Sequence, residues 1–134
     1  MKSHLNHLQI NINPKNLPFY KDLMNFIGWS VIFESQEMAG FTSGGEASLW
    51  FLKSQNNEQN NYDGFGVNHI GIKVEEMKHV DEAMEYLKTK NIEMLFGTPK
   101  HRPEFAMNEN ETYYQIMFKS PDNMLFEIVY TGTK

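Results

Sequence analysis

The chain has 134 residues, no cysteine and a formal net charge of −5 from 17 acidic and 12 basic residues. This length fits one compact domain, and the lack of cysteine excludes disulfides and thiolate metal ligands. The basic residues are scattered, so no positive stripe is available for a nucleic acid, and the polar N-terminal residues form neither a signal-peptide core nor a membrane span. We expect a cytoplasmic protein with no nucleic-acid or membrane partner.

The first half of the chain predicts a strand, a helix and a three-stranded meander. Residues 5–12 alternate between apolar and polar side chains, as in a strand with one buried face. The apolar side holds Leu8, Ile10 and Ile12, and the polar side holds His7, Gln9 and Asn11. Residues 16–27 carry apolar positions at helical spacing, with Asn16 able to cap the helix and Gly28 placed to end it. Strands are then predicted at 29–34, 38–42 and 47–53.

The second half repeats this order after a polar, asparagine-rich stretch at 54–66, which we interpret as a linker. A strand is predicted at 67–74, followed by a helix at about 76–90 that Asn91 ends in a left-handed conformation. Three more strands are predicted at 92–96, 112–119 and 124–130, with a loop at 97–111 and a tight turn at 120–123. Each half is therefore β-α-β-β-β.

The two halves also repeat a histidine. Asn68-His69-Ile70-Gly71-Ile72-Lys73-Val74 echoes Asn6-His7-Leu8-Gln9-Ile10-Asn11-Ile12. On the last predicted strand, Glu127 is the single charged residue among apolar neighbours, where a carboxylate without a partner would be costly to bury. If the halves bring these strands together, two imidazoles and one carboxylate can hold a divalent metal as a facial triad.

This arrangement resembles the vicinal oxygen chelate superfamily, which contains glyoxalase I, extradiol dioxygenases and the fosfomycin- and bleomycin-resistance proteins. The most specific segments are 68–74 and 114–127, the second of which is similar to the closing hairpin of the family with its metal-binding glutamate. The resemblance implies that His7, His69 and Glu127 are the metal ligands. The implied cofactor is one divalent ion, which zinc, iron, manganese or nickel could supply.

The resemblance also implies the architecture. It predicts one α+β domain over 1–134, with tandem modules at 4–53 and 67–131 joined by the linker at 54–66. The modules would form a cup-shaped, partly open mixed sheet with the helices outside. The expected protein is a homodimer, with exchange of modules between subunits as an open alternative.

The reaction stays open at this point. The resemblance favours a metal-dependent enzyme, a lyase, isomerase, thiol transferase or dioxygenase, that acts on a small molecule chelated through vicinal oxygens. The alternative is a metal-free protein of the bleomycin-resistance type that binds and sequesters a small molecule.

Seven further residues are candidates for the substrate pocket. Gln9, Asn11, Gly71 and Lys73 share strand faces with the two histidines, although such residues can also simply face water. Trp50 stands where glyoxalase I uses a carboxylate, and it either stacks on a flat ligand or, as we favour, fills the vacated volume. His101 and Arg102 lie in the predicted loop at 97–111, where a lid or an anion contact could form.

Overall fold

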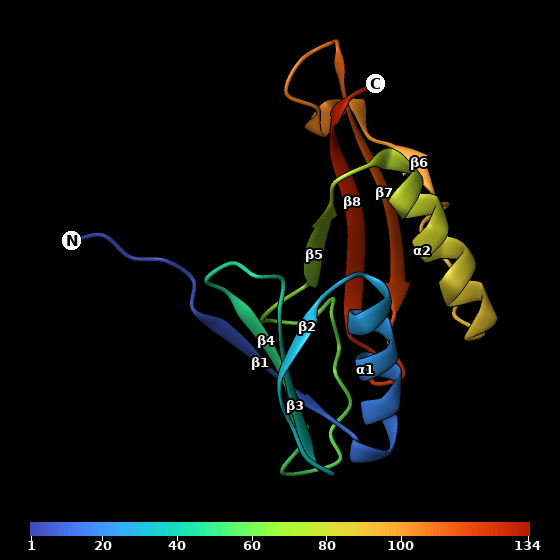
Figure 1. The fold of residues 1–134 in the computed structure, drawn as a ribbon. Helices are drawn as coiled ribbons and strands as arrows, with labels where there is room; N and C mark the ends of the chain where they lie inside the picture. Colours follow the sequence, from blue (N-terminus) through green and yellow to red (C-terminus); the bar gives the residue numbers. More distant parts are fainter. The chain divides into compact units, whose positions relative to one another are not determined.

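The computed structural model describes residues 1–134 and divides them into two compact units, Met1–Gln59 and Asn60–Lys134 (Figure 1). Each unit is a β-α-β-β-β module with its own four-stranded mixed sheet, which confirms the α+β fold class expected from the sequence. None of the helices is long and apolar enough to cross a membrane.

In the first unit the sheet has the strand order β1-β4-β3-β2, with β1 parallel to β4 and the other pairs antiparallel. Its elements are β1 (His7–Ile12), η1 (Pro14–Asn16), α1 (Leu17–Phe26), β2 (Ser30–Glu34), β3 (Met38–Thr42) and β4 (Ser48–Lys53). The alternation predicted for the first strand is confirmed, because Ile10 and Ile12 are buried whereas His7, Gln9 and Asn11 are exposed.

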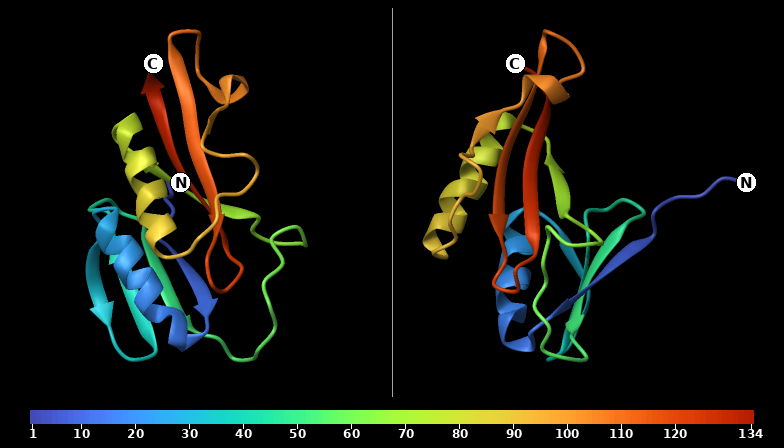
Figure 2. Two further views of the ribbon diagram at one scale, coloured as in Figure 1. Left: turned by 90° about the vertical axis from the view of Figure 1, so that its right-hand side faces the viewer. Right: turned by 180° about the vertical axis from the view of Figure 1, so that it is seen from behind.

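Helix α1 covers the apolar face of this sheet (Figure 2). Its buried side chains include Tyr20, Leu23 and Met24, which recur at helical spacing. The Tyr20 ring stacks on Phe51 of β4, with 4.3 Å between ring centroids. The face that carries His7 is therefore the one turned away from the helix.

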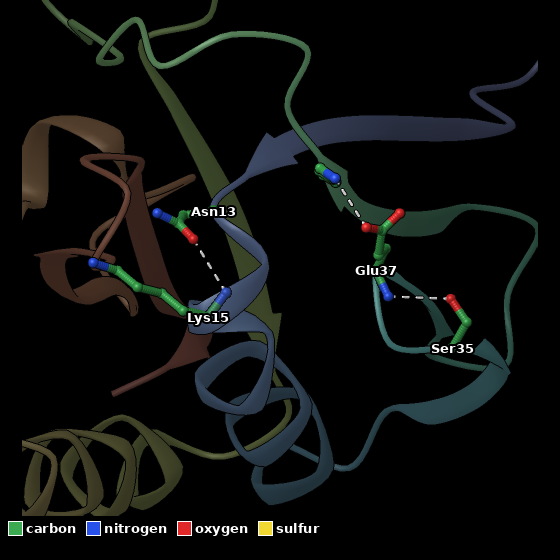
Figure 3. A network of polar contacts seen from close by, with 5 residues as sticks. Asn13, Lys15, Ser35 and Glu37 are labelled. Carbon is green, nitrogen blue, oxygen red and sulfur yellow. Dashed lines mark hydrogen bonds and ion pairs between the residues drawn. The ribbon is translucent and has the colours of Figure 1, made fainter.

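The start of the helical segment differs from the prediction. The side chain that caps it is Asn13, whose Oδ1 accepts a hydrogen bond from the Lys15 backbone N–H at 3.1 Å (Figure 3). Asn16 already has helical backbone angles and makes no side-chain cap, because Pro14, with its fixed φ, begins the helical turn earlier. Gly28 ends the segment as predicted, with a φ of 86°.

A second polar cluster closes the turn between β2 and β3. Ser35 Oγ accepts a hydrogen bond from the Glu37 backbone N–H at 3.3 Å (Figure 3). The Glu37 carboxylate accepts one from Lys53 Nζ at 2.9 Å, which ties the turn to the end of β4. These contacts are exposed, so they fix the geometry of the turn and add little to stability.

The second unit has the strand order β5-β8-β7-β6, with β5 parallel to β8. Its elements are β5 (His69–Val74), α2 (Met77–Thr89), β6 (Lys100–His101), η2 (Pro103–Phe105), β7 (Glu111–Lys119) and β8 (Leu125–Thr133). Helix α2 packs on β7 and β8 and buries Val80, Ala83 and Leu87. Asn91 follows it with a φ of 58°, which confirms the predicted left-handed end.

The prediction of a strand at 92–96 is wrong. Only one isolated bridge forms there, between Met94 and Phe118, and the fourth strand of the sheet is β6, inside the predicted loop. Phe96 and Gly97 both have positive φ, at 57° and 68°. A positive φ is incompatible with an extended strand, so regular pairing with β7 begins only at Lys100.

The core of the second unit predicts a clear contrast between two phenylalanines. Phe118 is fully buried and stacks on Phe126, with 5.7 Å between centroids, whereas Phe65 of the same unit is fully exposed. Phe118→Ala should lower the free energy of unfolding by about 3 to 5 kcal/mol, because it removes buried contacts and leaves a cavity. Phe65→Ala should change it by less than about 0.5 kcal/mol. Urea unfolding measures both values, and equal losses would contradict this description of the core.

Candidate functional site

The candidate site of the second unit is built around Glu127 on β8. In the sheet register this residue lies opposite Gly71 on β5 and Met117 on β7, on the face turned away from α2. It is 4% exposed, so its charge needs partners. A Cβ added at Gly71 would stand 3.5 Å from Glu127 Oε2. The glycine therefore leaves the carboxylate uncovered on the β5 side.

Two side chains meet the Glu127 carboxylate. Tyr113 Oη donates a hydrogen bond to Oε1 at 2.7 Å, and His69 Nε2 lies 3.1 Å from Oε2. Burial, followed by the hydrogen bond to Glu127 and the charge of that carboxylate, raises the pKa of Tyr113 to about 12. The phenol therefore stays protonated and serves as a donor throughout the physiological pH range.

A chain of hydrogen bonds sets the tautomer of His69. Asn68 Nδ2 donates to the Tyr62 carbonyl at 2.8 Å, which fixes the orientation of the amide. Asn68 Oδ1 then lies 2.8 Å from His69 Nδ1, and because it can only accept, Nδ1 must carry the proton. In a neutral imidazole the lone pair is therefore on Nε2, the nitrogen that faces Glu127.

The first unit repeats this pair on β1. Asn6 Oδ1 lies 2.6 Å from His7 Nδ1, and His7 is exposed on the face turned away from α1. The same argument assigns the proton to Nδ1 when Asn6 presents its oxygen, and leaves the Nε2 lone pair for another partner. Each unit thus presents one imidazole held by the asparagine that precedes it.

Next to Glu127 the second unit contains a cavity of about 560 Å³. The side chains that line it come from β5, β7, β8 and the segments before β5 and around β6. They are Tyr62, Asp63, Asn68, His69, Phe96, Arg102, Phe105, Tyr113, Gln115, Met117, Leu125 and Glu127. A volume of this size suits a small organic molecule.

Gln115 is a cavity residue that sequence reasoning missed. It is 3% exposed and lines the cavity. The signal in the sequence was a polar residue between Tyr113 and Met117 at the same strand parity.

Two other lining residues come from the predicted linker. Tyr62 and Asp63 lie in the stretch at 54–66, which has no helix or strand but closes one side of the cavity. Asn60 Nδ2 donates to the Asn123 carbonyl at 2.9 Å and attaches this stretch to the β7–β8 turn. An irregular segment gives no periodic signal, so the sequence did not reveal this role.

The two candidate pocket residues of the predicted loop at 97–111, Arg102 and His101, lie on opposite sides of the sheet. Arg102 lines the cavity, as expected for a ligand contact. His101 does not: its ring lies 4.5 Å from that of Tyr114, and its Nδ1 is 2.6 Å from Thr112 Oγ1. Because neighbouring strand residues face opposite sides, His101 shares the helix-covered side of the sheet. His101 therefore does not line this cavity.

The remaining pocket candidates keep their predicted strand faces. Lys73 is exposed on β5, and in the first unit Gln9 Nε2 donates to Asn11 Oδ1 at 3.5 Å. None of these three lines the cavity of the second unit.

Trp50 makes its contacts inside the first unit. Its indole lies over Gly40, where an added Cβ would be 2.8 Å from the ring, and its Nε1 donates to Ser48 Oγ at 3.0 Å. Its ring centroid is 6.2 Å from that of Phe33. Trp50 thus packs on β3 within the first unit.

Of the three candidate metal ligands, the structure brings His69 and Glu127 together in the second unit, and His7 lies on β1 of the first. No group of three or more histidine, aspartate or glutamate side chains is close enough to hold a metal ion. The second unit by itself therefore supplies two of the three expected donors.

No protein-family model and no curated protein matches the sequence. Solved structures do match over nearly the whole chain. A candidate glyoxalase from Bacillus halodurans is 21% identical, with a TM-score of 0.77 and 94% of each chain covered. The chain has the vicinal oxygen chelate fold. The fosfomycin resistance protein FosX from Listeria monocytogenes, in a complex with Mn(II) and sulfate, is also similar, at 23% identity and a TM-score of 0.66, with 96% of this chain and 90% of that chain covered.

A third similar structure, a glyoxalase/bleomycin resistance protein/dioxygenase from Alicyclobacillus acidocaldarius, is 18% identical. Its TM-score is 0.61, and the match covers 95% of this chain and 90% of that chain. At these identities the likeness establishes the fold, whereas the chemistry depends on the particular residues of the site.

The Tyr113–Glu127 contact predicts how Tyr113 titrates. Its folded pKa of about 12 lies above the ordinary value of 10, so its contribution to stability is present below pH 10 and is lost as the pH rises toward 12. Glu127→Gln removes the carboxylate charge and should lower the pKa of Tyr113. Carbon NMR of ring-labelled tyrosine measures the ionised fraction.

Tyr114 provides a matched control for this titration. Burial and its hydrogen bond to Asp81 raise its pKa to about 12 as well. Asp81→Asn should lower the pKa of Tyr114 and leave that of Tyr113 unchanged. If Glu127→Gln shifts both tyrosines equally, the assignment of a specific Tyr113–Glu127 interaction is incorrect.

Proposed function

We propose that this protein is a divalent-metal-dependent enzyme that acts on a small molecule chelated through vicinal oxygens. The observation that carries the proposal is the 3.1 Å contact between His69 Nε2 and Glu127 Oε2. With the Nδ1 proton directed at Asn68, both of these atoms are acceptors when the imidazole is neutral and the carboxylate is ionised. Two acceptors at this distance need a cation between them, either a proton or a metal ion.

The donor set fits a metal ion. A metal-bound histidine usually donates its other N–H to an amide or carboxylate oxygen, which is the role Asn68 has here. Tyr113 in turn donates to the second carboxylate oxygen and orients Glu127. Nitrogen and oxygen donors of this kind suit zinc, iron, manganese or nickel.

The third ligand in this proposal is His7. It has the same asparagine-held imidazole and the same place in its unit as His69. We propose that the two units form a single domain in which His7 joins His69 and Glu127, or that two chains exchange units in a homodimer so that the ligands come from both subunits. Both assemblies present the same three donors.

The residues around this donor set have separable tasks. When bound, a divalent ion would act as a Lewis acid toward a substrate oxygen that gains negative charge. His69 and Glu127 would hold it, while Tyr113 keeps the carboxylate in position and Gly71 leaves space beside Oε2. Phe96, Phe105, Met117 and Leu125 supply apolar walls around this donor set.

The solved structures support this proposal. FosX from Listeria monocytogenes has also been solved as a variant in which one glutamate is replaced by glutamine, in a complex with Mn(II) and 1S,2S-dihydroxypropylphosphonic acid. The name of that ligand places two hydroxyl oxygens on adjacent carbons. A protein of this fold can therefore accommodate both a divalent metal and a vicinal diol.

A second candidate function is a metal-free binder that sequesters a planar compound. The aromatic lining of the cavity favours it, because Phe96, Phe105 and Tyr113 can pack against a ring with no metal present. Metal content separates the two functions.

The full chain, purified without chelators and then dialysed against Mn(II) or Zn(II), should retain the metal in a fixed ratio to protein. His69→Ala and Glu127→Ala should each remove most of it, since each deletes a donor. The matched control is His79→Ala on α2, which also deletes a histidine but does not line the cavity. Elemental analysis measures the ratio. Equal retention by all four proteins would favour the binder.

Asn68 gives a finer prediction about the ligand environment. Asn68→Ala should weaken metal binding by about 10- to 100-fold, because it frees the imidazole to take the other tautomer. Asn56→Ala, which removes an exposed asparagine of the first unit, should leave the affinity unchanged. Competition with a coloured chelator measures the affinities. An unchanged affinity for Asn68→Ala would contradict the claim that Asn68 prepares His69 for metal binding by setting its tautomer.

A further inference from the structure

We propose that the cavity of the second unit selects an aromatic anion, a small molecule with a planar ring that packs against Phe96 and Phe105 and a carboxylate or similar oxyanion bound by Arg102. The proposal rests on the proposed function for its site and adds a substrate class to it, since His69 and Glu127 line the same cavity. The anion contact itself requires no metal.

Arg102 is held in place while keeping hydrogen-bond donors available. Its backbone N–H donates to the Tyr113 carbonyl at 2.7 Å, which fixes the start of the η2 segment to β7. Its side chain is 28% exposed, and its Nε donates to Glu104 at 2.5 Å. The terminal guanidinium nitrogens are left for another acceptor, and their fork geometry matches a carboxylate or phosphonate.

The ring of Phe105 packs against the guanidinium. Arg102 Cζ lies 4.7 Å from the Phe105 ring centroid, and Phe105 packs edge-on against Tyr113 at 5.4 Å. Stacking of this kind restricts the arginine to one side of the cavity without using its donors. Because Tyr113 contacts Glu127, the cationic group and the proposed metal ligands lie around one hollow.

Two exposed phenylalanines form the aromatic wall. Phe96 is 53% exposed and Phe105 is 54% exposed, although both line the cavity. Exposing aromatic rings to water costs free energy, and a planar ligand that covers the two rings would remove this cost.

Gln115 adds a polar side chain to the wall of the cavity. It is 3% exposed and lines the cavity. It can offer both a donor and an acceptor to a hydroxyl or carbonyl of the ligand. The other charged group on the wall, besides the proposed metal ligands, is Asp63, which is exposed and well solvated.

The test compares three probes on the full chain, before and after addition of Mn(II). Benzoate carries a ring and a negative charge, benzamide carries the ring without the charge, and acetate carries the charge without the ring. Ligand-observed NMR titration gives each affinity. We expect wild-type protein to prefer benzoate to both other probes, in the metal-free protein as well.

Substitutions at Arg102 and Lys100 test which residue causes the preference for benzoate. Arg102→Gln should weaken benzoate binding by about tenfold or more, the loss expected for a hydrogen bond to a charged group, and leave benzamide unchanged. Lys100→Gln is the matched control, because it removes the same charge from a nearby exposed residue that does not line the cavity. It should leave all affinities unchanged. Circular dichroism and thermal unfolding establish that each variant is folded.

Equal binding of benzoate and benzamide to wild-type protein would overturn the proposal, as would equal effects of Arg102→Gln and Lys100→Gln. A second variant, Arg102→Lys, keeps the charge and removes the planar fork, so it should weaken benzoate less than Arg102→Gln does. Loss of metal binding in the experiments on His69 and Glu127 tests the proposed function separately. An anion preference that persists in metal-free protein therefore stands even if that function fails.

Discussion

The parallel pairing of β5 with β8 is the constraint on which the candidate site depends. Its register places Glu127 opposite Gly71, two residues from His69 on the same face, so a contact across the two strands follows from backbone hydrogen bonds. The apolar residues of these strands lie under α2 and hold the register, because a slip of one residue would bury His69 and expose the core. The first unit uses the same parallel pairing, between β1 and β4.

The contact between a histidine and the asparagine that precedes it is repeated in both units. In each unit the asparagine oxygen lies beside Nδ1 of the histidine that follows it, at 2.6 Å for His7 and 2.8 Å for His69. The repeat therefore includes both the histidine and the asparagine that selects its tautomer. The second unit then adds what the first lacks, a buried carboxylate with a tyrosine donor.

Most of the fold could be predicted from the sequence because period-two and helical patterns are local, and these placed both helices and seven of the eight strands. The strand expected at 92–96 failed because the positive φ of Phe96 is a tertiary outcome with no pattern in the sequence. For the same reason Gln115 was overlooked, since only the observed cavity distinguishes it from a core position. His69 and Glu127 could be selected because histidine repeats between the halves and a charge interrupts an apolar strand.

The Tyr62 carbonyl shows that the segment before β5 takes part in the chemistry of the site. It fixes the Asn68 amide, and through that amide it determines which imidazole nitrogen of His69 carries the proton. A backbone group in a stretch without regular structure thereby governs the tautomer of a side chain that it does not contact. A change in the length of this connection would therefore alter which nitrogen is offered to a ligand, while every donor residue stayed the same.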